Sequence, residues 1–150
     1  IRIGTCGAYT TDLKLFDLLN VENSASESTY AQFAWGIEGE LIPHQGNAFE
    51  VINETASSLS INAKATNIHT SDIFYRKDSG IPAVAEKYNC LAVEMEAFAL
   101  FANAKYLGKN AATILTVSDV IPTHEQISAD ERERALKPMI ELALESAIKL

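Results

Sequence analysis

The sequence predicts an α/β fold, with a mixed, largely parallel central sheet flanked by helices. Two observations support this prediction. Short apolar, β-branched runs alternate along the chain with longer segments of helical periodicity, an order typical of parallel sheets covered by helices. The length of 150 residues suits one domain, and 47% of the residues are hydrophobic, enough to bury a core. We therefore expect residues 1–150 to form a single α/β domain.

The first half of the chain is expected to contribute the first strands and one helix. Phe49, Ile52, Ala56 and Leu59 recur at helical spacing and should share the buried face of that helix. The remaining elements are predicted from apolar runs and the polar or small residues that interrupt them. Strands are predicted at residues 1–3, 13–21 and 63–69, with a small-residue turn over 4–8 and a polar loop or frayed strand over 22–29.

The second half is expected to contribute two more strands and the remaining helices. Strands are predicted at residues 90–93 and 111–117, with helices at 81–88, at 97–107 and from 128 onward. Pro82 suits the first turn of the first helix, and Gly108 suits the end of the second. The last helix opens on a capping box at residues 128–131. Its buried face is expected to comprise Ala135, Met139, Leu142, Ala143 and Ile148.

Composition excludes several classes of function. The net charge of −8 disfavours nucleic acid and anionic membranes as partners. The longest apolar run, residues 97–102, is far too short to span a membrane. Cys6 and Cys90 show neither disulfide-rich nor metal-binding spacing, and no signal peptide is visible. We therefore expect a cytoplasmic protein with reduced thiols and no metal site.

Polar residues follow four of the predicted strands. They occupy residues 5–7, 70–72, 94–96 and 118–119, each directly after an apolar run. In parallel α/β sheets, ligands bind beyond the carboxyl ends of the strands. The four segments are therefore expected to meet at one ligand site.

Carboxylates are the first candidates for chemistry at this site. Glu94 and Glu96 flank Met95, and a carboxylate can accept hydrogen bonds from two neighbouring sugar hydroxyls. The alternative is an ordinary acidic preference at a helix N-terminus. Asp119 ends a strand expected to be buried, where it is either a catalytic group or a cap for the following turn.

Other candidates have weaker signals. The turn containing Thr5, Cys6 and Gly7 offers backbone N–H groups and a hydroxyl to an anion, although small residues at strand ends are usually plain turns. Arg132 stands in the first turn of a helix, where the helix dipole disfavours a cation, so it has either a local task or a solvated charge. Phe74 follows a strand end and either stacks on a ligand or fills the core.

Six segments in register resemble the bacterial hexameric class of purine nucleoside phosphorylases. They are RIGTCGA (2–8), SDIFY (71–75), VEMEA (93–97), TVSD (116–119), THEQ (123–126) and ADER (129–132). The resemblance runs in order along the whole chain. It implies a nucleoside phosphorylase-like fold and a pentosyltransferase that cleaves purine nucleosides with phosphate.

The resemblance also implies a role for each matching residue. Asp119 would be the general acid at purine N7, and Arg132 would assist it. Thr5 stands where the family usually has serine, and it keeps the hydroxyl. The implied contacts are Arg2 and Thr5 with phosphate, Glu94, Met95 and Glu96 with ribose, and Cys6, Gly7, Phe74 and Ser118 with the base.

The same resemblance implies the partners. The reaction needs no cofactor, and inorganic phosphate is the co-substrate. Family members carry an upstream segment with further phosphate-binding arginines, and a neighbouring subunit supplies an arginine and a histidine. We therefore expect this chain to be the C-terminal catalytic portion of a longer protein that forms a homo-oligomer, a hexamer by resemblance.

Three alternatives stay open. A uridine phosphorylase of the same fold lacks the acid, so Asp119 argues against it. A methylthioadenosine nucleosidase keeps the acid but uses water, and Arg2 argues for phosphate instead. A truncated, non-catalytic nucleoside-binding module is the third.

Overall fold

The computed structural model of the chain describes residues 1–77, 80–128, 130–131 and 136–150. Within them, a seven-stranded sheet has the order β3-β2-β4-β5-β1-β6-β7. The strands are β1 (Arg2–Ala8), β2 (Leu18–Ala25), β3 (Leu41–Pro43), β4 (Ala63–Thr70), β5 (Ala92–Glu94), β6 (Thr113–Val120) and β7 (Glu125–Gln126). The helices are α1 (Tyr30–Trp35), α2 (Ala48–Ser58), α3 (Ala83–Lys87), α4 (Ala97–Leu107) and α6 (Lys137–Ala147), with a short 3₁₀ helix, η1 (Ile121–Thr123).

The sheet is mixed, and its two longest ladders are parallel. β1 pairs in parallel with β6, and β2 pairs in parallel with β4. β1 runs antiparallel to its other neighbour, β5. A further antiparallel pairing joins β2 to β6, so the strands β2, β4, β5, β1 and β6 close into a ring. The predicted α/β fold with a mixed sheet flanked by helices is confirmed.

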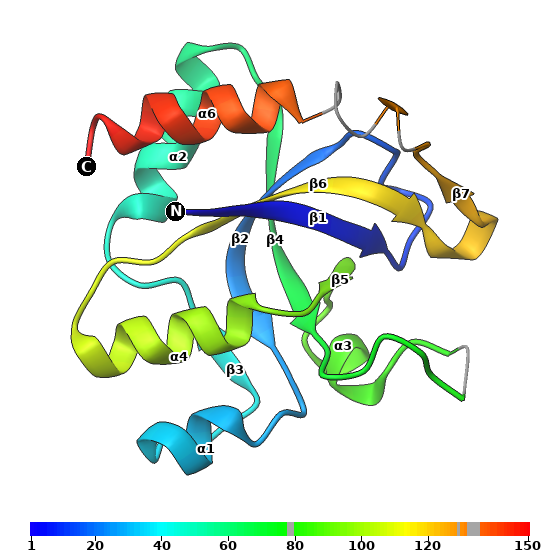
Figure 1. The fold of residues 1–150 in the computed structure, drawn as a ribbon, viewed down its shortest axis with the longest axis vertical. Coiled ribbons are helices and arrows are strands. Elements are labelled where there is room, and N and C mark those ends of the chain that lie inside the picture. The colour runs from blue at the N-terminus through cyan, green and yellow to red at the C-terminus, as the bar shows by residue number, and fades with distance from the viewer. Residues whose placement is uncertain (78–79, 129, 132–135) are drawn as a thin grey trace.

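Helices cover the sheet in two groups. Figure 1 shows α2 and α6 packed together, apart from α4 and α1. Phe98 and Phe101 of α4 are fully buried in one core cluster that includes Leu115 of β6. Ile52 of α2 and Leu142 of α6 belong to a second cluster on the other side. Both faces of the sheet are therefore covered by apolar side chains, which fixes the strand ends that carry polar residues.

The first strand differs from its prediction. The sequence predicts that the strand ends at residue 3 and gives way to a turn, but β1 continues to Ala8. Small residues are unusual in a strand interior, yet parallel pairing with β6 supplies their backbone partners. The register shifts between Cys6 and Gly7, which pair with Val117 and Asp119, so the extra residue of this irregularity is Ser118 of β6.

The second strand lies further along the chain than predicted. β2 begins at Leu18 rather than at residue 13, and it includes residues 22–25, which the sequence predicts to be loop or frayed strand. The error arose because buried polar residues in β2 have partners on distant segments. Ser24 is buried with its Oγ 2.7 Å from Thr70 Oγ1, and the amide of Asn23 donates to Asn67 Oδ1 at 2.8 Å. The short α1 and β3 were not predicted.

The C-terminal half follows its predictions more closely. α4 has the predicted bounds and ends at Gly108, whose positive φ of 61° suits glycine. The predicted capping box is present, because Glu131 accepts a hydrogen bond from the Ser128 N–H at 2.9 Å and donates its own N–H to Ser128 Oγ. β6 extends past residue 117 and includes Ser118 and Asp119.

The buried face of the last helix is partly corrected. α6 begins at Lys137, with a proline in its first turn. Met139, Leu142 and Ala143 are buried as predicted, but Ile148 lies beyond the helix and is 78% exposed. Ala135 lies outside the described residues. None of the described helices is long and apolar enough to cross a membrane.

Candidate active site

A cavity of about 710 Å³ opens where β1, β5 and β6 meet the segment after β4. Its walls bring together every site residue predicted from the sequence that the structure describes. These are Arg2, Thr5, Cys6, Gly7, Phe74, Glu94, Met95, Glu96, Ser118 and Asp119. Arg132, predicted to assist Asp119, lies outside the described residues. The four polar segments at the predicted strand ends therefore do share one site, although each arrives from a different part of the chain.

Two glycines of β1 shape the floor of the cavity. A Cβ at Gly4 would lie 3.0 Å from Nη1 of Arg2, so the missing side chain lets the guanidinium fold over the strand. A Cβ at Gly7 would meet the Ile121 side chain at 3.3 Å. The absence of a side chain at Gly7 therefore lets Ile121 pack closely against the strand.

Arg2 lies between two carboxylates. Its Nη1 is 3.1 Å from Oε2 of Glu94, and its Nη2 donates a hydrogen bond to Oε2 of Glu96. The Glu94 side chain is 1% exposed, whereas that of Glu96 is 60% exposed. Only Glu96 is therefore available to a ligand without rearrangement of the fold.

Glu94 is anchored to the start of α4. Its carboxylate accepts hydrogen bonds from the N–H groups of Glu96 and Ala97, each at 3.0 Å, and from the Thr70 hydroxyl at 2.5 Å. Burial raises the pKa of Glu94 above its usual range, against the lowering effects of Thr70 and Arg2. These contacts join β4, β5 and α4, so Glu94 holds Arg2 and the following residues in place.

Asp119 enters the cavity from the end of β6. Oγ of Ser118 lies 2.5 Å from Oδ2 of Asp119 and 3.3 Å from the Cys6 carbonyl. The hydroxyl therefore links the carboxylate to β1. The neighbouring Cys6 thiol is buried, and burial together with Glu94 and Asp119 raises its pKa. Cys6 is thus a protonated thiol in the wall of the cavity.

Residues 1–148 match the Phosphorylase superfamily. The chain belongs to this superfamily. It is 40% identical over 153 residues to a DeoD-type purine nucleoside phosphorylase of Mycoplasma genitalium, covering 100% of this chain and 64% of that protein. It is 38% identical over 151 residues to a protein of the same name from Brevibacillus brevis, covering 99% of this chain and 63% of that protein. The chain thus spans a little under two thirds of these relatives.

A solved structure shares the fold. The 5′-methylthioadenosine/S-adenosyl homocysteine nucleosidase of Campylobacter jejuni superposes with a TM-score of 0.83, covering 99% of this chain and 68% of that one. Its sequence identity is 24%. This likeness supports the phosphorylase-superfamily fold.

Phe74 reaches the cavity from the segment after β4. It lines the cavity but is 75% exposed, and it meets Tyr75 in an edge-to-face contact with ring centroids 5.0 Å apart. An exposed aromatic at the rim of a cavity can cover a flat ligand. Its exposure rules out the alternative that Phe74 fills the core.

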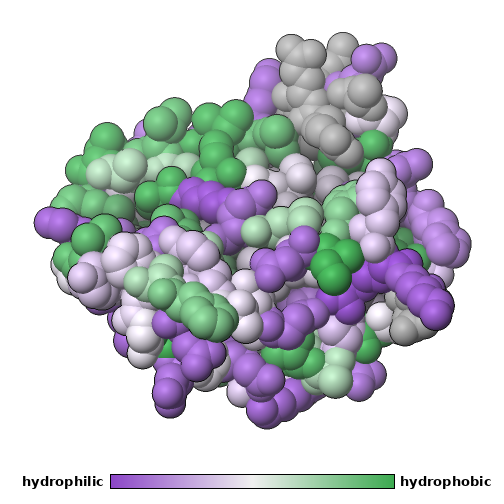
Figure 2. Space-filling model, turned by 60° about the horizontal axis from the view of Figure 1, so that its bottom comes forward, coloured by the Kyte–Doolittle hydropathy of each residue, from purple (hydrophilic) through white to green (hydrophobic). Residues whose placement is uncertain are grey.

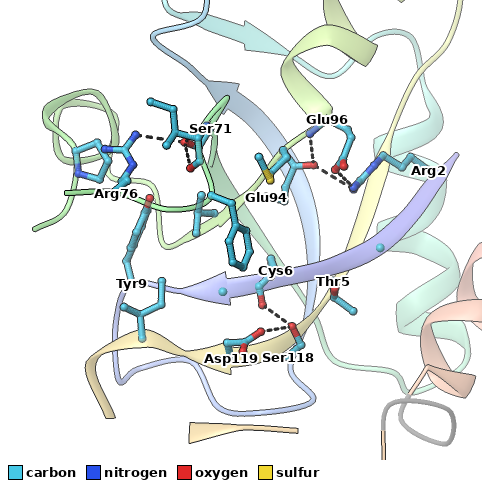
Figure 3. A pocket seen from close by; sticks show the side chains of 18 of the residues that line it. Arg2, Thr5, Cys6, Tyr9, Ser71, Arg76, Glu94, Glu96, Ser118 and Asp119 are labelled. Carbon is cyan, nitrogen blue, oxygen red and sulfur yellow. Dashed lines mark hydrogen bonds and ion pairs between the residues drawn. The ribbon is translucent and has the colours of Figure 1, made fainter. Parts of the chain in front are cut away.

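The sequence did not predict most of the residues at the end of the cavity opposite Arg2. Tyr9, Ser71 and Arg76 line it, and Figure 3 shows Tyr9 and Arg76 on the side opposite Arg2. Nδ1 of His69 lies 2.7 Å from the Tyr9 hydroxyl. Ser71 belongs to a predicted polar strand end, but Tyr9 and Arg76 follow no motif. Their proximity depends on pairing between segments far apart in sequence. Among the residues that the structure describes, no group of His, Cys, Asp or Glu side chains could hold a metal ion.

Proposed function

We propose that the protein is a purine nucleoside phosphorylase, which cleaves purine ribo- or deoxyribonucleosides to the free base and the pentose 1-phosphate. The observation that supports this most is the order of groups along the cavity. Figure 3 shows Arg2, Thr5 and the exposed carboxylate of Glu96 on one side of the cavity, with the Asp119 carboxyl nearer its middle. The relatives named as DeoD-type purine nucleoside phosphorylases support the same activity.

The cavity suits a reaction in which the base leaves as a neutral molecule. A purine anion is a poor leaving group, so the Asp119 carboxyl delivers a proton to N7 while the C1′–N9 bond breaks. Phosphate held by Arg2 and Thr5 then forms the new C1′–O bond. Glu96 accepts hydrogen bonds from the vicinal ribose hydroxyls, and Met95 packs against the sugar.

The test is a product assay on the full-length protein. Adenosine and inosine are incubated with and without inorganic phosphate, and base and ribose 1-phosphate are quantified. Phosphate-dependent formation of both products in equal amounts supports the proposal. Equal cleavage without phosphate, yielding free ribose, would replace it with the second candidate below.

A hydrolytic nucleosidase is the second candidate, because of how Arg2 is paired. Among the described residues that line the cavity, Arg2 and Arg76 are the basic ones, and they lie at opposite ends. Arg2 already faces the carboxylates of Glu94 and Glu96. Phosphate must therefore compete with Glu96 for the guanidinium, whereas water need not.

We further propose a homo-oligomer in which other groups complete the phosphate site. Inorganic phosphate carries between one and two negative charges at pH 7, and the net charge of the chain is −8. Arg2, already paired with two carboxylates, is not enough to neutralise that charge. Large apolar side chains are also exposed on the single chain, including Phe33, Tyr106 and Ile148. Figure 2 shows hydrophobic residues gathered on one side of the face drawn. Such surface is typical of contacts between subunits.

Light scattering on the full-length protein tests this assembly. The expected particle is a multiple of the protomer mass, with the hexamer as the expected state. An active monomer would contradict the proposal.

A further inference from the structure

A chain of hydrogen bonds closes the end of the cavity away from Arg2. The Tyr9 hydroxyl lies 2.7 Å from Nδ1 of His69, and Nε2 of His69 lies 2.7 Å from Oε2 of Glu27. Nη2 of Arg76 donates to Oε1 of Glu27 at 2.6 Å and to the Ser71 hydroxyl at 3.3 Å. Tyr9 and Arg76, the two ends of this hydrogen-bond chain, line the cavity and can touch a ligand there.

The carboxylate of Glu27 sets the direction of these hydrogen bonds. Burial raises the pKa of Glu27, but hydrogen bonds from His69, the backbone and Arg76 outweigh it and hold the pKa below its usual value. An ionised carboxylate only accepts hydrogen bonds, so Nε2 of His69 must carry a hydrogen.

The protonation state of His69 decides whether the Tyr9 hydroxyl donates or accepts. Its ring is fully buried, and burial lowers the pKa of His69 more than the Glu27 carboxylate raises it. The ring is therefore neutral at pH 7, and Nδ1 is an acceptor. The pKa of Tyr9 is raised to about 12, mainly by burial, so its hydroxyl is intact and donates to Nδ1. The Tyr9 oxygen then has only lone pairs to offer to the cavity.

Arg76 offers the opposite polarity. Its guanidinium carries N–H donors and no acceptor. The contacts described above engage Nη2, and the side chain remains 30% exposed at the cavity. This end of the cavity therefore presents an acceptor on Tyr9 beside donors on Arg76.

The order of residues along β1 indicates which part of a nucleoside meets this end. β1 carries Arg2 at its start and Gly7 near its end, and Tyr9 follows. In the proposed pose, phosphate and ribose lie toward Arg2 and the base lies next to Gly7. Tyr9 and Arg76 then face the edge of the purine farthest from the sugar. That edge carries the C6 substituent and N1.

Strand pairing distinguishes the two contacts. Asp119 is the register partner of Gly7, two residues before Tyr9, whereas Arg76 comes from the segment after β4. In a purine, the C6 substituent projects to the same side as N7, where Asp119 acts. Tyr9 is therefore the neighbour of the C6 substituent, and Arg76 is the neighbour of N1.

We propose that this end of the cavity selects 6-aminopurine nucleosides over 6-oxopurine nucleosides, with Tyr9 and Arg76 as the specificity-determining residues. A 6-amino group donates to the Tyr9 oxygen, and the unprotonated N1 accepts from Arg76. In a 6-oxopurine both partners are reversed: O6 faces the lone pairs of Tyr9, and the N1–H faces the N–H donors of Arg76. The inference rests on the proposed action on purine nucleosides.

The experiment compares adenosine with inosine, which differ only at this edge. In the full-length protein with phosphate, kcat/KM for adenosine is expected to exceed that for inosine by about tenfold or more, the effect of one to two hydrogen bonds. Tyr9→Phe should lower kcat/KM for adenosine by about 5- to 10-fold without lowering it for inosine. Tyr88→Phe is the matched control, since its hydroxyl contacts Glu40 at 3.4 Å and does not line the cavity.

Each other outcome has a separate meaning. Equal or better use of inosine by the unaltered protein, or an unchanged adenosine-to-inosine ratio in Tyr9→Phe, overturns the inference and leaves the phosphorylase proposal standing. Absence of cleavage of both nucleosides sinks the proposed function instead. In that case titration calorimetry with adenine and hypoxanthine decides the inference, and equal or tighter binding of hypoxanthine overturns it.

A second measurement does not depend on a variant that folds. Nitrogen-15 spectra of the histidine rings in the unaltered protein report which nitrogen of His69 is protonated. The inference requires hydrogen on Nε2 and a bare Nδ1. Hydrogen on Nδ1 of a neutral ring would free the Tyr9 hydroxyl to donate and would overturn it.

Discussion

Arg2 and Glu96 form an ion pair at the cavity although 94 positions separate them in the sequence. The pair occupies both groups that we assign to substrates, the guanidinium to phosphate and the carboxylate to ribose. Substrate binding must therefore exchange this contact for contacts with phosphate and with the ribose hydroxyls. The pair satisfies both charges and holds them where, in the proposed reaction, sugar and phosphate would meet.

Glu96→Gln tests this exchange. The amide keeps the shape but replaces a charged acceptor, so kcat/KM for nucleoside is expected to fall by about tenfold or more. The KM for phosphate should not rise, because Arg2 loses a competitor. Steady-state kinetics with each substrate varied in turn measure both effects. Glu54→Gln on α2, away from the cavity, is the control, and an unchanged kcat/KM in Glu96→Gln would remove Glu96 from the site.

Asp119→Ala should lower kcat on natural purine nucleosides by at least about 100-fold, the smaller end of the range for general acid catalysis. A 7-methylated purine nucleoside provides the internal control, because its base leaves as a neutral molecule without a proton from the enzyme. Its kcat should fall far less. Equal losses on the two substrates would show that Asp119 is structural.

Much of the fold could be predicted because local signals agree with the tertiary structure. α4 has an apolar run at residues 97–102, a glycine at its end and a buried strand before it, and its bounds were predicted correctly. The end of β2 was misplaced because Ser24 belongs to a polar segment typical of a loop or a frayed strand. The Ser24 side chain is buried through a partner on a distant segment, Thr70. No local pattern reveals such partners.

The candidate site likewise contains residues that the sequence could identify and residues that it could not. The residues toward Arg2 and Asp119 belong to contiguous motifs, and a resemblance could identify them together. The hydrogen-bonded residues Tyr9, His69 and Glu27 form no sequence motif, because Tyr9 follows β1, His69 lies in β4 and Glu27 follows β2. His69 alone in a sequence is most simply a buried structural residue, and only its two partners give it a further role.

Thr70→Val should destabilise the protein. The Thr70 hydroxyl donates to Glu94, lies 2.7 Å from Ser24 Oγ and accepts the N–H of Phe98 at 3.1 Å. Valine has nearly the same shape but leaves these buried groups unpaired, so the free energy of unfolding should fall by about 2 kcal/mol or more. Urea denaturation measures it.

Thr113→Val is the matched control for that experiment. Thr113 is fully buried, and its hydroxyl has no hydrogen-bond partner among the residues that the structure describes. Removing it should leave stability unchanged or raise it slightly. If both variants lose the same stability, the Thr70 hydrogen bonds do not account for the effect.

The buried His69 should make the protein sensitive to mild acid. Burial lowers the pKa of His69 in the folded state, while the unfolded chain keeps the ordinary value of about 6.5. The stability that this group contributes is therefore fully present above pH 6.5 and is lost as the pH falls from there toward the folded pKa. The unfolded state then binds up to one more proton, so the slope reaches at most about 1.4 kcal/mol per pH unit. Glu27, whose folded pKa is lowered, adds its own loss only below about pH 4.3.

Urea midpoints measured from pH 7.5 to 5.0 should fall in the unaltered protein and fall less in His69→Phe. Parallel curves for the two proteins would mean that His69 is already protonated in the fold, and the Tyr9 hydroxyl would then no longer be held as a donor to it.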